Sequence, residues 1–185
     1  MFGSPSDDAL VRKALKGQAD AWDKLIRRYE GRVYNFAMRM TGNRDDAMDL
    51  MQNIFLAVYR GLASFRGESE FSSWLFAIAS FRTTDFYRRR RFTEDLDEGE
   101  MAEEGLLHTQ SPFGHVVSKQ RNKCVMQALA QLPEEQRLVV ELKFFQDLTF
   151  DEISEQLGVS ANTLKSRLYG ALKKIKAMPE VMHVV

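Results

Sequence analysis

Hydroxyl, amide and basic side chains are concentrated in one short stretch near the C-terminus. Side chains of these types hydrogen-bond to base edges and to phosphates in DNA complexes. The set comprises Asn162, Thr163, Lys165, Ser166, Arg167, Tyr169 and Lys173. Leu164, Leu168 and Leu172 recur between them at helical spacing, so one face of a helix is apolar and the polar set lies outside it. The pattern predicts a helix that presents polar groups to the major groove of DNA.

The longer stretch 149–175 predicts two helices around a tight turn. Apolar residues recur at three- and four-residue spacing in the first helix. Gly158 ends that helix, because glycine tolerates the left-handed backbone of a C-terminal cap. Either Ser160 or Asn162 caps the second helix. This is the pattern of a helix-turn-helix. The competing interpretation is an ordinary helical hairpin with a solvated basic face.

Four consecutive arginines, residues 88–91, end a helix that is predicted to begin at Ser72 or Ser73. Arginine on phosphates, combined with rings on unstacked bases, is the chemistry of single-stranded nucleic acid binding. The aromatic residues nearby are Phe65, Phe71, Trp74, Phe81, Phe86 and Tyr87. Alternatively, the arginines favour the negative end of the helix dipole and most of the rings are core. We expect Phe71 and Trp74 to belong at least partly to the core.

The formal net charge is zero, but charge is divided unevenly along the chain. Residues 1–91 hold 16 Lys and Arg against 11 Asp and Glu, whereas residues 92–115 hold seven acidic residues and no basic one. The acidic segment also contains glycines and a proline and lacks periodicity, so it predicts a flexible linker. Two small helical domains, 1–91 and 116–179, are expected on either side of it, followed by a tail at 180–185.

The fold class predicted for both domains is all-α, because there are only four prolines and few alternating apolar runs. A long helix is expected over about residues 47–62. The single cysteine, Cys124, excludes an internal disulfide and suits a reducing cytoplasm. No apolar run is long enough to span a bilayer, and the N-terminus lacks a signal-peptide core.

Groupings typical of enzymes are missing from the sequence. There is no phosphate-binding glycine-rich loop, and the three histidines lack the spacing of a zinc site. The acidic cluster, which an enzyme acting on nucleic acid would need inside a folded domain, falls in the predicted linker. We therefore expect no active site, no cofactor and no metal.

Two groups of motifs resemble the extracytoplasmic-function (ECF, group IV) RNA polymerase sigma factors of the sigma-70 family. The family's second conserved region is similar to DLMQNIF at 49–55, FRGES at 65–69 and FSSWL at 71–75. Its fourth conserved region is similar to LPEEQR at 132–137 and TLKSRL at 163–168. The resemblance covers nearly the whole chain outside the linker and the tail.

The resemblance implies a non-enzymatic initiation factor that directs RNA polymerase to a promoter class and helps to melt the start site. It assigns binding to the clamp helices of the polymerase's largest subunit to Asp49, Gln52, Asn53 and Phe55. It assigns contacts with the minus-ten element to Phe65, Arg66, Phe71, Trp74, Arg82, Asp85, Arg88 and Arg89. It assigns contacts with the minus-thirty-five element to Asn162, Thr163, Lys165, Ser166, Arg167, Tyr169 and Lys173.

The partners that the resemblance implies are core RNA polymerase, promoter DNA and an anti-sigma factor. The setting is the cytoplasm, without membrane insertion, and the genes served form a stress- or envelope-responsive regulon. The linker would either enter polymerase channels or act as a plain tether. The alternative function is a stand-alone helix-turn-helix regulator that binds an operator as a dimer.

Three residues depart from the family pattern. Asn53 stands where glutamate is usual, Phe81 where asparagine is frequent, and Gly170 where a basic residue can occur. These departures leave the promoter sequence unpredicted.

Overall fold

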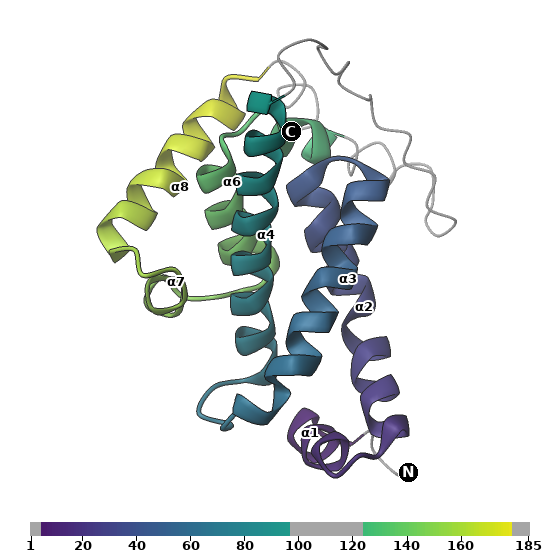
Figure 1. The fold of residues 1–185 in the computed structure, drawn as a ribbon. Coiled ribbons are helices and arrows are strands. Elements are labelled where there is room, and N and C mark those ends of the chain that lie inside the picture. The colour runs from purple at the N-terminus through teal and green to yellow at the C-terminus, as the bar shows by residue number, and fades with distance from the viewer. Residues whose placement is uncertain (1–4, 97–123, 179–185) are drawn as a thin grey trace.

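The computed structural model describes residues 5–96 and 124–178, and within these two ranges every regular element is a helix (Figure 1). The expected all-α fold is therefore confirmed for this part of the chain. Three sequence-based expectations lie outside the described residues: the greater part of the acidic linker, the first residues of the predicted domain 116–179, and the tail.

The N-terminal half is a bundle of long helices. They are α1 (Asp7–Leu15), α2 (Ala19–Thr41), α3 (Arg44–Gly61), the short 3-10 helix η1 (Leu62–Ser64) and α4 (Phe71–Leu96). Gly42 ends α2 in the left-handed conformation, with a φ of 70°. The Asn43 side chain then caps α3 by accepting hydrogen bonds from the backbone N–H groups of Asp45 and Asp46. These signals turn the chain back within two residues, so α2 and α3 pack side by side.

The helix α4 is longer at both ends than the sequence predicted. It begins at Phe71 and not at a serine cap, and it continues past the arginine run to Leu96. The extension has a simple cause, because the residues that follow Arg91 include no glycine or proline before Gly99. The first residues of the predicted linker are therefore helical.

The C-terminal half is a second, smaller helical group. Residues 124–130 are helical. They are followed by α6 (Glu134–Val140), a π-helical turn η2 (Glu141–Phe145), α7 (Phe150–Leu157) and α8 (Ala161–Lys176). Buried in this half are Leu142, Ile153, Leu164, Leu168 and Ala171. Leu172, which was expected on the inner face, is 39% exposed, because the buried positions of α8 advance by four and then three residues and reach Ala171 instead.

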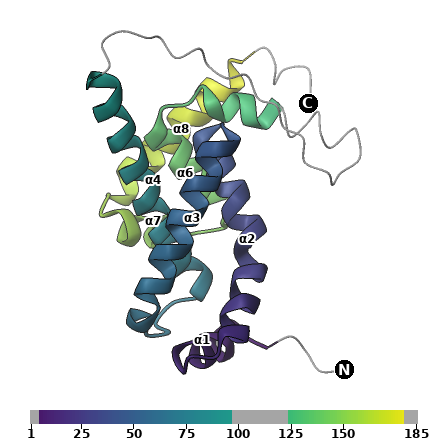
Figure 2. The same ribbon diagram turned by 45° about the vertical axis from the view of Figure 1, so that its right-hand side comes forward.

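The two halves pack against each other. Contacts join α2 to α6 and α4 to α7, and the views in Figures 1 and 2 both place the C-terminal helices along one side of the bundle. Buried side chains from both halves form one continuous hydrophobic cluster.

A capping box fixes the start of α7. The Thr149 hydroxyl accepts a hydrogen bond from the Glu152 backbone N–H, and the Glu152 carboxylate accepts two in return, from the Thr149 backbone N–H and hydroxyl, both at 2.7 Å. These hydrogen bonds from Thr149 lower the pKa of Glu152. The helix-turn-helix thus has a defined first residue.

Thr149→Ala is expected to lower the free energy of unfolding by about 1 kcal/mol at pH 7. A lowered folded-state pKa makes the carboxylate's contribution present above its unfolded pKa, about 4.3, and lost as the pH falls through the folded value. The difference in the free energy of unfolding between the unaltered protein and Thr149→Ala should therefore become smaller below about pH 4. Urea unfolding at several pH values measures this, with Glu152→Gln as the control that removes the charge. A difference independent of pH would contradict the role of the carboxylate.

Candidate nucleic-acid interface

The turn between α7 and α8 has the geometry of a helix-turn-helix. Gly158 adopts a φ of 64°, the left-handed conformation expected at the end of the first helix. Ser160 caps α8, since its hydroxyl accepts a hydrogen bond from the Thr163 backbone N–H at 3.1 Å. Of the two predicted caps, the structure selects Ser160 and leaves Asn162 exposed.

The outer face of α8 carries the predicted polar set. Exposed side chains on it are Asn162, Thr163, Lys165, Ser166, Tyr169 and Lys173. Arg167 differs from these, because its guanidinium lies 2.6 Å from the Glu135 carboxylate and its side chain is 25% exposed. The structure thus brings together all seven predicted residues on one helix, with one of them held by an ion pair from α6.

Gly170 has a packing role that the sequence did not reveal. A β-carbon at this position would lie 3.0 Å from the Gln136 side-chain nitrogen, which is tighter than ordinary contact. The glycine therefore allows α8 to lie close to α6. A larger side chain here would have to displace Gln136 before it reached DNA.

A second polar surface lies where the loop after η1 meets the start of α4. It contains a pocket with a volume of about 280 Å³, lined by Ser64, Phe65, Arg66, Glu68, Ser69 and Trp74. The Phe65 and Trp74 rings have centroids 5.2 Å apart and form an aromatic wall. Phe71 is 1% exposed and touches both rings from beneath, so it supports the wall and has no surface to offer DNA. The expectation that Phe71 and Trp74 belong partly to the core is confirmed.

The arginines of α4 are not equivalent. Asp85 lies 3.6 Å from Arg82 and 3.0 Å from Arg88, so it bridges two of the predicted DNA contacts. Arg90 pairs with Asp46, and Arg91 pairs with Glu134. Arg89 is exposed. Half of the four-arginine run therefore joins α4 to other helices.

A third surface lies on the outer face of α3. Asp49, Gln52 and Asn53 are exposed there as predicted, whereas Phe55 is half-buried against the core. The Asn53 side chain donates a hydrogen bond to the Asp49 carbonyl of its own helix at 2.9 Å.

Apolar side chains that the sequence did not lead us to expect accompany this polar set. They are Met48, Leu56 and Tyr59, which are 46%, 46% and 62% exposed. Their spacing of eight and eleven residues places them on one side of the helix. The same periodicity that revealed the buried face would have revealed this second stripe. Contiguous exposed apolar patches rimmed by polar residues are typical of protein-binding surfaces.

Metal-binding clusters and membrane-spanning helices are both missing from the described ranges. Residues 5–96 and 124–178 contain no group of three or more His, Cys, Asp or Glu side chains placed to hold a metal ion. None of the helices in these ranges has the length and apolar character needed to cross a bilayer.

Comparisons with known proteins agree with this arrangement. Residues 25–93 match the family described as Sigma-70 region 2, and residues 122–175 match Sigma-70, region 4. The chain is 31% identical over 166 residues to the ECF RNA polymerase sigma factor SigW of Bacillus subtilis. The aligned residues cover 86% of this chain and 89% of SigW. It is 30% identical over 177 residues to the ECF RNA polymerase sigma-E factor of Escherichia coli K12, with 92% of each protein covered.

Solved structures share the fold. The sigma factor RpoE in complex with the anti-sigma factor NepR from Bartonella quintana superposes with a TM-score of 0.68 at 20% identity, covering 83% of this chain and 93% of that one. CnrH in complex with the cytosolic domain of CnrY superposes with a TM-score of 0.65 at 23% identity, covering 94% and 96%. Both sigma-70 regions are present in order, and the likeness to SigW and sigma-E spans nearly the whole chain. The chain therefore belongs to the ECF branch of the sigma-70 family and is an RNA polymerase sigma factor, a transcription initiation factor of a non-enzymatic class.

Proposed function

We propose that α8 reads the minus-thirty-five element, that the pocket beside α4 holds a base of the melted minus-ten element, and that α3 docks on core RNA polymerase. The observation that carries the proposal is the presence of all three surfaces on one chain, each built from a different element. On this division, residues 1–91 form the melting and polymerase-binding domain and residues 116–179 form the minus-thirty-five domain.

Recognition at the minus-thirty-five element uses the outer face of α8. A helix of this kind lies in the major groove, where base edges present distinct patterns of donors and acceptors. Lys165 and Ser166 are exposed near the N-terminal half of α8, the part of a recognition helix that reaches base edges. Arg167, whose guanidinium pairs with Glu135 of α6, contacts backbone phosphate.

Opening at the minus-ten element uses the pocket at the start of α4. Extruding a base costs a few kcal/mol, and stacking on an aromatic ring returns about 1–3 kcal/mol per base. Trp74 and Phe65 supply that stacking surface, and Arg66 supplies positive charge at the pocket mouth. Arg88 and Arg89 follow along α4 and bind the phosphates of the same strand.

Docking on the polymerase uses α3, with Asp49, Gln52, Asn53 and Phe55 as the predicted contacts. The exposed apolar residues Met48, Leu56 and Tyr59 extend that surface. A polar set beside an apolar stripe matches the composition of a protein interface.

Regulation follows the pattern of the structural relatives, which were solved with anti-sigma factors bound. An anti-sigma factor that covers these surfaces would keep the chain from polymerase. The protein would act in the cytoplasm, where polymerase and promoters are, and serve a stress- or envelope-responsive regulon.

Run-off transcription from genomic fragments tests the proposal. Core polymerase with this protein is expected to produce specific starts that core polymerase alone does not. Lys165→Ala and Arg89→Ala are each expected to weaken those starts by about fivefold or more, because a lost groove or phosphate contact costs about 1–3 kcal/mol.

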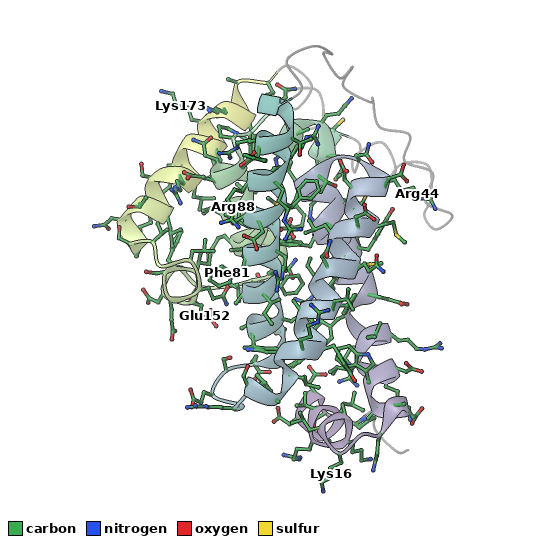
Figure 3. The ribbon with its side chains drawn as sticks, in the orientation of Figure 1. Lys16, Arg44, Phe81, Arg88, Glu152 and Lys173 are labelled. Atoms are coloured by element: carbon green, nitrogen blue, oxygen red, sulfur yellow. The ribbon has the colours of Figure 1, made fainter. Side chains whose placement is uncertain are left out.

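Lys16→Ala is the matched control, since Lys16 is an exposed cation at the far end of the molecule from α8 (Figure 3). Starts that Lys165→Ala and Arg89→Ala leave as strong as Lys16→Ala does would contradict the assigned surfaces. Absence of polymerase binding, with tight operator binding by a dimer of this chain, would replace the proposal with the stand-alone regulator.

A further inference from the structure

The pocket beside α4 has a buried support that begins in α1. The Tyr29 hydroxyl of α2 donates a hydrogen bond to the Asp7 carboxylate of α1 at 2.5 Å. The Tyr29 ring packs edge-on against Phe71, with the two ring centroids 5.4 Å apart. Tyr29 is 5% exposed and Phe71 is 1% exposed. We call Asp7, Tyr29 and Phe71 the pocket brace.

Phe71 connects the pocket brace to the aromatic wall of the pocket. Its ring centroid lies 5.5 Å from that of Phe65 and 5.7 Å from that of Trp74, and both of these residues line the pocket. Ring pairs at such distances attract one another in edge-to-face and tilted arrangements. Because close-packed interiors transmit strain, a shift of the Tyr29 ring displaces Phe71 and, with it, the two rings of the wall.

The helix α1 is attached to the bundle around Asp7. Arg28 of α2 donates hydrogen bonds to the Asp7 carboxylate and to the Pro5 carbonyl, the second at 2.7 Å. Leu10 and Val11 are buried beneath α1. Contacts also join α1 to η1, which leads into the pocket loop, and Figures 1 and 2 both place α1 at the end of the bundle where α4 begins. The helix α1 therefore reaches the pocket both through the brace and through η1.

The hydrogen bond in the brace depends on a protonated phenol. Burial and the hydrogen bond to the Asp7 carboxylate both raise the pKa of Tyr29, so the hydroxyl keeps its proton and donates. Leaving a buried donor without its acceptor is more costly than removing donor and acceptor together. If the Asp7 carboxylate is removed, the Tyr29 hydroxyl must therefore turn toward water, which draws the ring away from Phe71.

We infer that Asp7 and Tyr29 are positioning residues of the base pocket. The helix α1 holds Tyr29, Tyr29 holds Phe71, and Phe71 holds the ring wall that receives an unpaired base. Neither Asp7 nor Tyr29 lines the pocket, so both act through Phe71. The consequence for promoter opening rests on the proposed function, whereas the effect of the brace on the shape of the pocket does not.

Fluorescence of Trp74 reports the shape of the pocket in the free chain. The sequence has two tryptophans, so Trp22→Phe leaves Trp74 as the only one. In this background, Asp7→Ala is expected to increase acrylamide quenching of Trp74 and to shift its emission to longer wavelength, because the ring wall opens to water. Tyr29→Phe keeps the ring and is expected to cause a smaller change. Asp7→Ala combined with Tyr29→Phe is expected to return to the Tyr29→Phe value, since no unpaired hydroxyl remains.

Asp8→Ala is the matched control. Asp8 is exposed and stands beside Asp7 in the first turn of α1, so its removal takes the same charge from the same helix end. Circular dichroism at the same temperature checks that each variant keeps its helices. Quenching in Asp7→Ala equal to that in Asp8→Ala overturns the inference, as does a double variant that is quenched more than Asp7→Ala. If Asp7→Ala does not fold, quenching of Tyr29→Phe equal to that of the unaltered pocket overturns it.

A second arm follows promoter DNA with core polymerase and the full chain. Asp7→Ala is expected to lower permanganate reactivity of the minus-ten thymines by about fivefold, which is less than the full value of a charge-assisted hydrogen bond because the brace acts only through Phe71. Protection of the minus-thirty-five element should stay at the level of the unaltered protein, because α8 lies in the other half of the chain. Equal losses at both elements would indicate a general loss of structure and overturn the inference.

Trp74→Ala distinguishes failure of the brace from failure of the proposed function. Normal opening by Trp74→Ala, together with increased quenching in Asp7→Ala, would refute the base pocket and support the brace. Loss of opening in Trp74→Ala, together with unchanged quenching and opening in Asp7→Ala, would refute the brace alone.

Discussion

Trp74→Ala is expected to abolish promoter opening while leaving polymerase binding intact. The indole forms a wall of the 280 Å³ pocket, with its centroid 5.2 Å from that of Phe65 and 5.7 Å from that of Phe71. Alanine removes two aromatic contacts, worth about 0.5–1.5 kcal/mol each, and a stacking surface worth about 1–3 kcal/mol to an unpaired base. The upper end of the stacking range, about 3 kcal/mol, corresponds to more than about a hundredfold in opening, whereas the lost ring contacts lower the stability of the pocket.

Permanganate reactivity of promoter thymines measures the opened strand directly. Trp74→Phe is the matched control, since it keeps a ring in the pocket and should retain a substantial part of the reactivity. Polymerase binding should be unchanged in both variants, because the proposed docking surface on α3 does not include Trp74. Normal opening by a folded Trp74→Ala protein would show that the pocket holds no base.

The elements that the sequence predicted well are those fixed by near neighbours. The helix-turn-helix follows from periodicity, a glycine in the left-handed conformation and a serine cap, and all of these act within a few residues. The turn between α2 and α3 is fixed in the same local way, since Asn43 caps the next helix with its own side chain. Ser160 and Asn162 were locally equal as caps, and in the structure it is the Ser160 hydroxyl that accepts from the Thr163 backbone N–H.

The features that the sequence did not predict depend on distant residues. Arg39 and Glu141 form an ion pair although they are 102 positions apart, and each looks like an ordinary solvated charge on a helix. The burial of Glu141 follows from the packing of α6 and η2 on α2, which no local pattern encodes. The prediction that Leu172 faces inward was wrong for a related reason. Helical spacing allows either Ala171 or Leu172 to face inward, and the packing of the neighbouring helix determines which one does. The pocket likewise depends on how the loop closes over Trp74.

Arg137 is another residue whose importance comes from distant partners. One guanidinium nitrogen donates to the Met40 carbonyl at 2.5 Å and to the Tyr87 hydroxyl at 3.2 Å. The other donates to the carbonyls of Ala130 and Leu132 at 2.8 and 3.0 Å. The side chain thus ties the helical segment 124–130, the start of α6 and the N-terminal bundle to one point.

The local electrostatics favour a permanent cation at this point. Met40 lies in the last turn of α2, where carbonyls lack helical partners and the helix dipole is negative. Burial raises the pKa of Tyr87 although Arg137 acts in the opposite direction, so the phenol stays protonated and donates to the same Met40 carbonyl. Both donors therefore converge on one acceptor.

Arg137→Ala is expected to destabilise the folded chain far more than the loss of an exposed cation such as Lys16 or Lys24. Hydrogen bonds from a charged donor contribute about 1.5–3 kcal/mol each, but the four share one side chain and the exposed acceptors regain water. A net loss of about 3 kcal/mol is expected, which for a chain of this size lowers the melting temperature by about 6–12 °C. Differential scanning calorimetry measures both quantities.

Arg137→Lys separates the charge from the geometry. Lysine keeps the positive charge, but its compact ammonium cannot place two forked donors on acceptors at opposite ends, so most of the loss should remain. A lysine variant as stable as the unaltered protein would show that charge at the end of α2 is sufficient. Retained stability in the alanine variant would show that the acceptors are solvated in solution. The expected order, in which lysine falls closer to alanine than to arginine, would show that the planar fork of Arg137 joins the two halves.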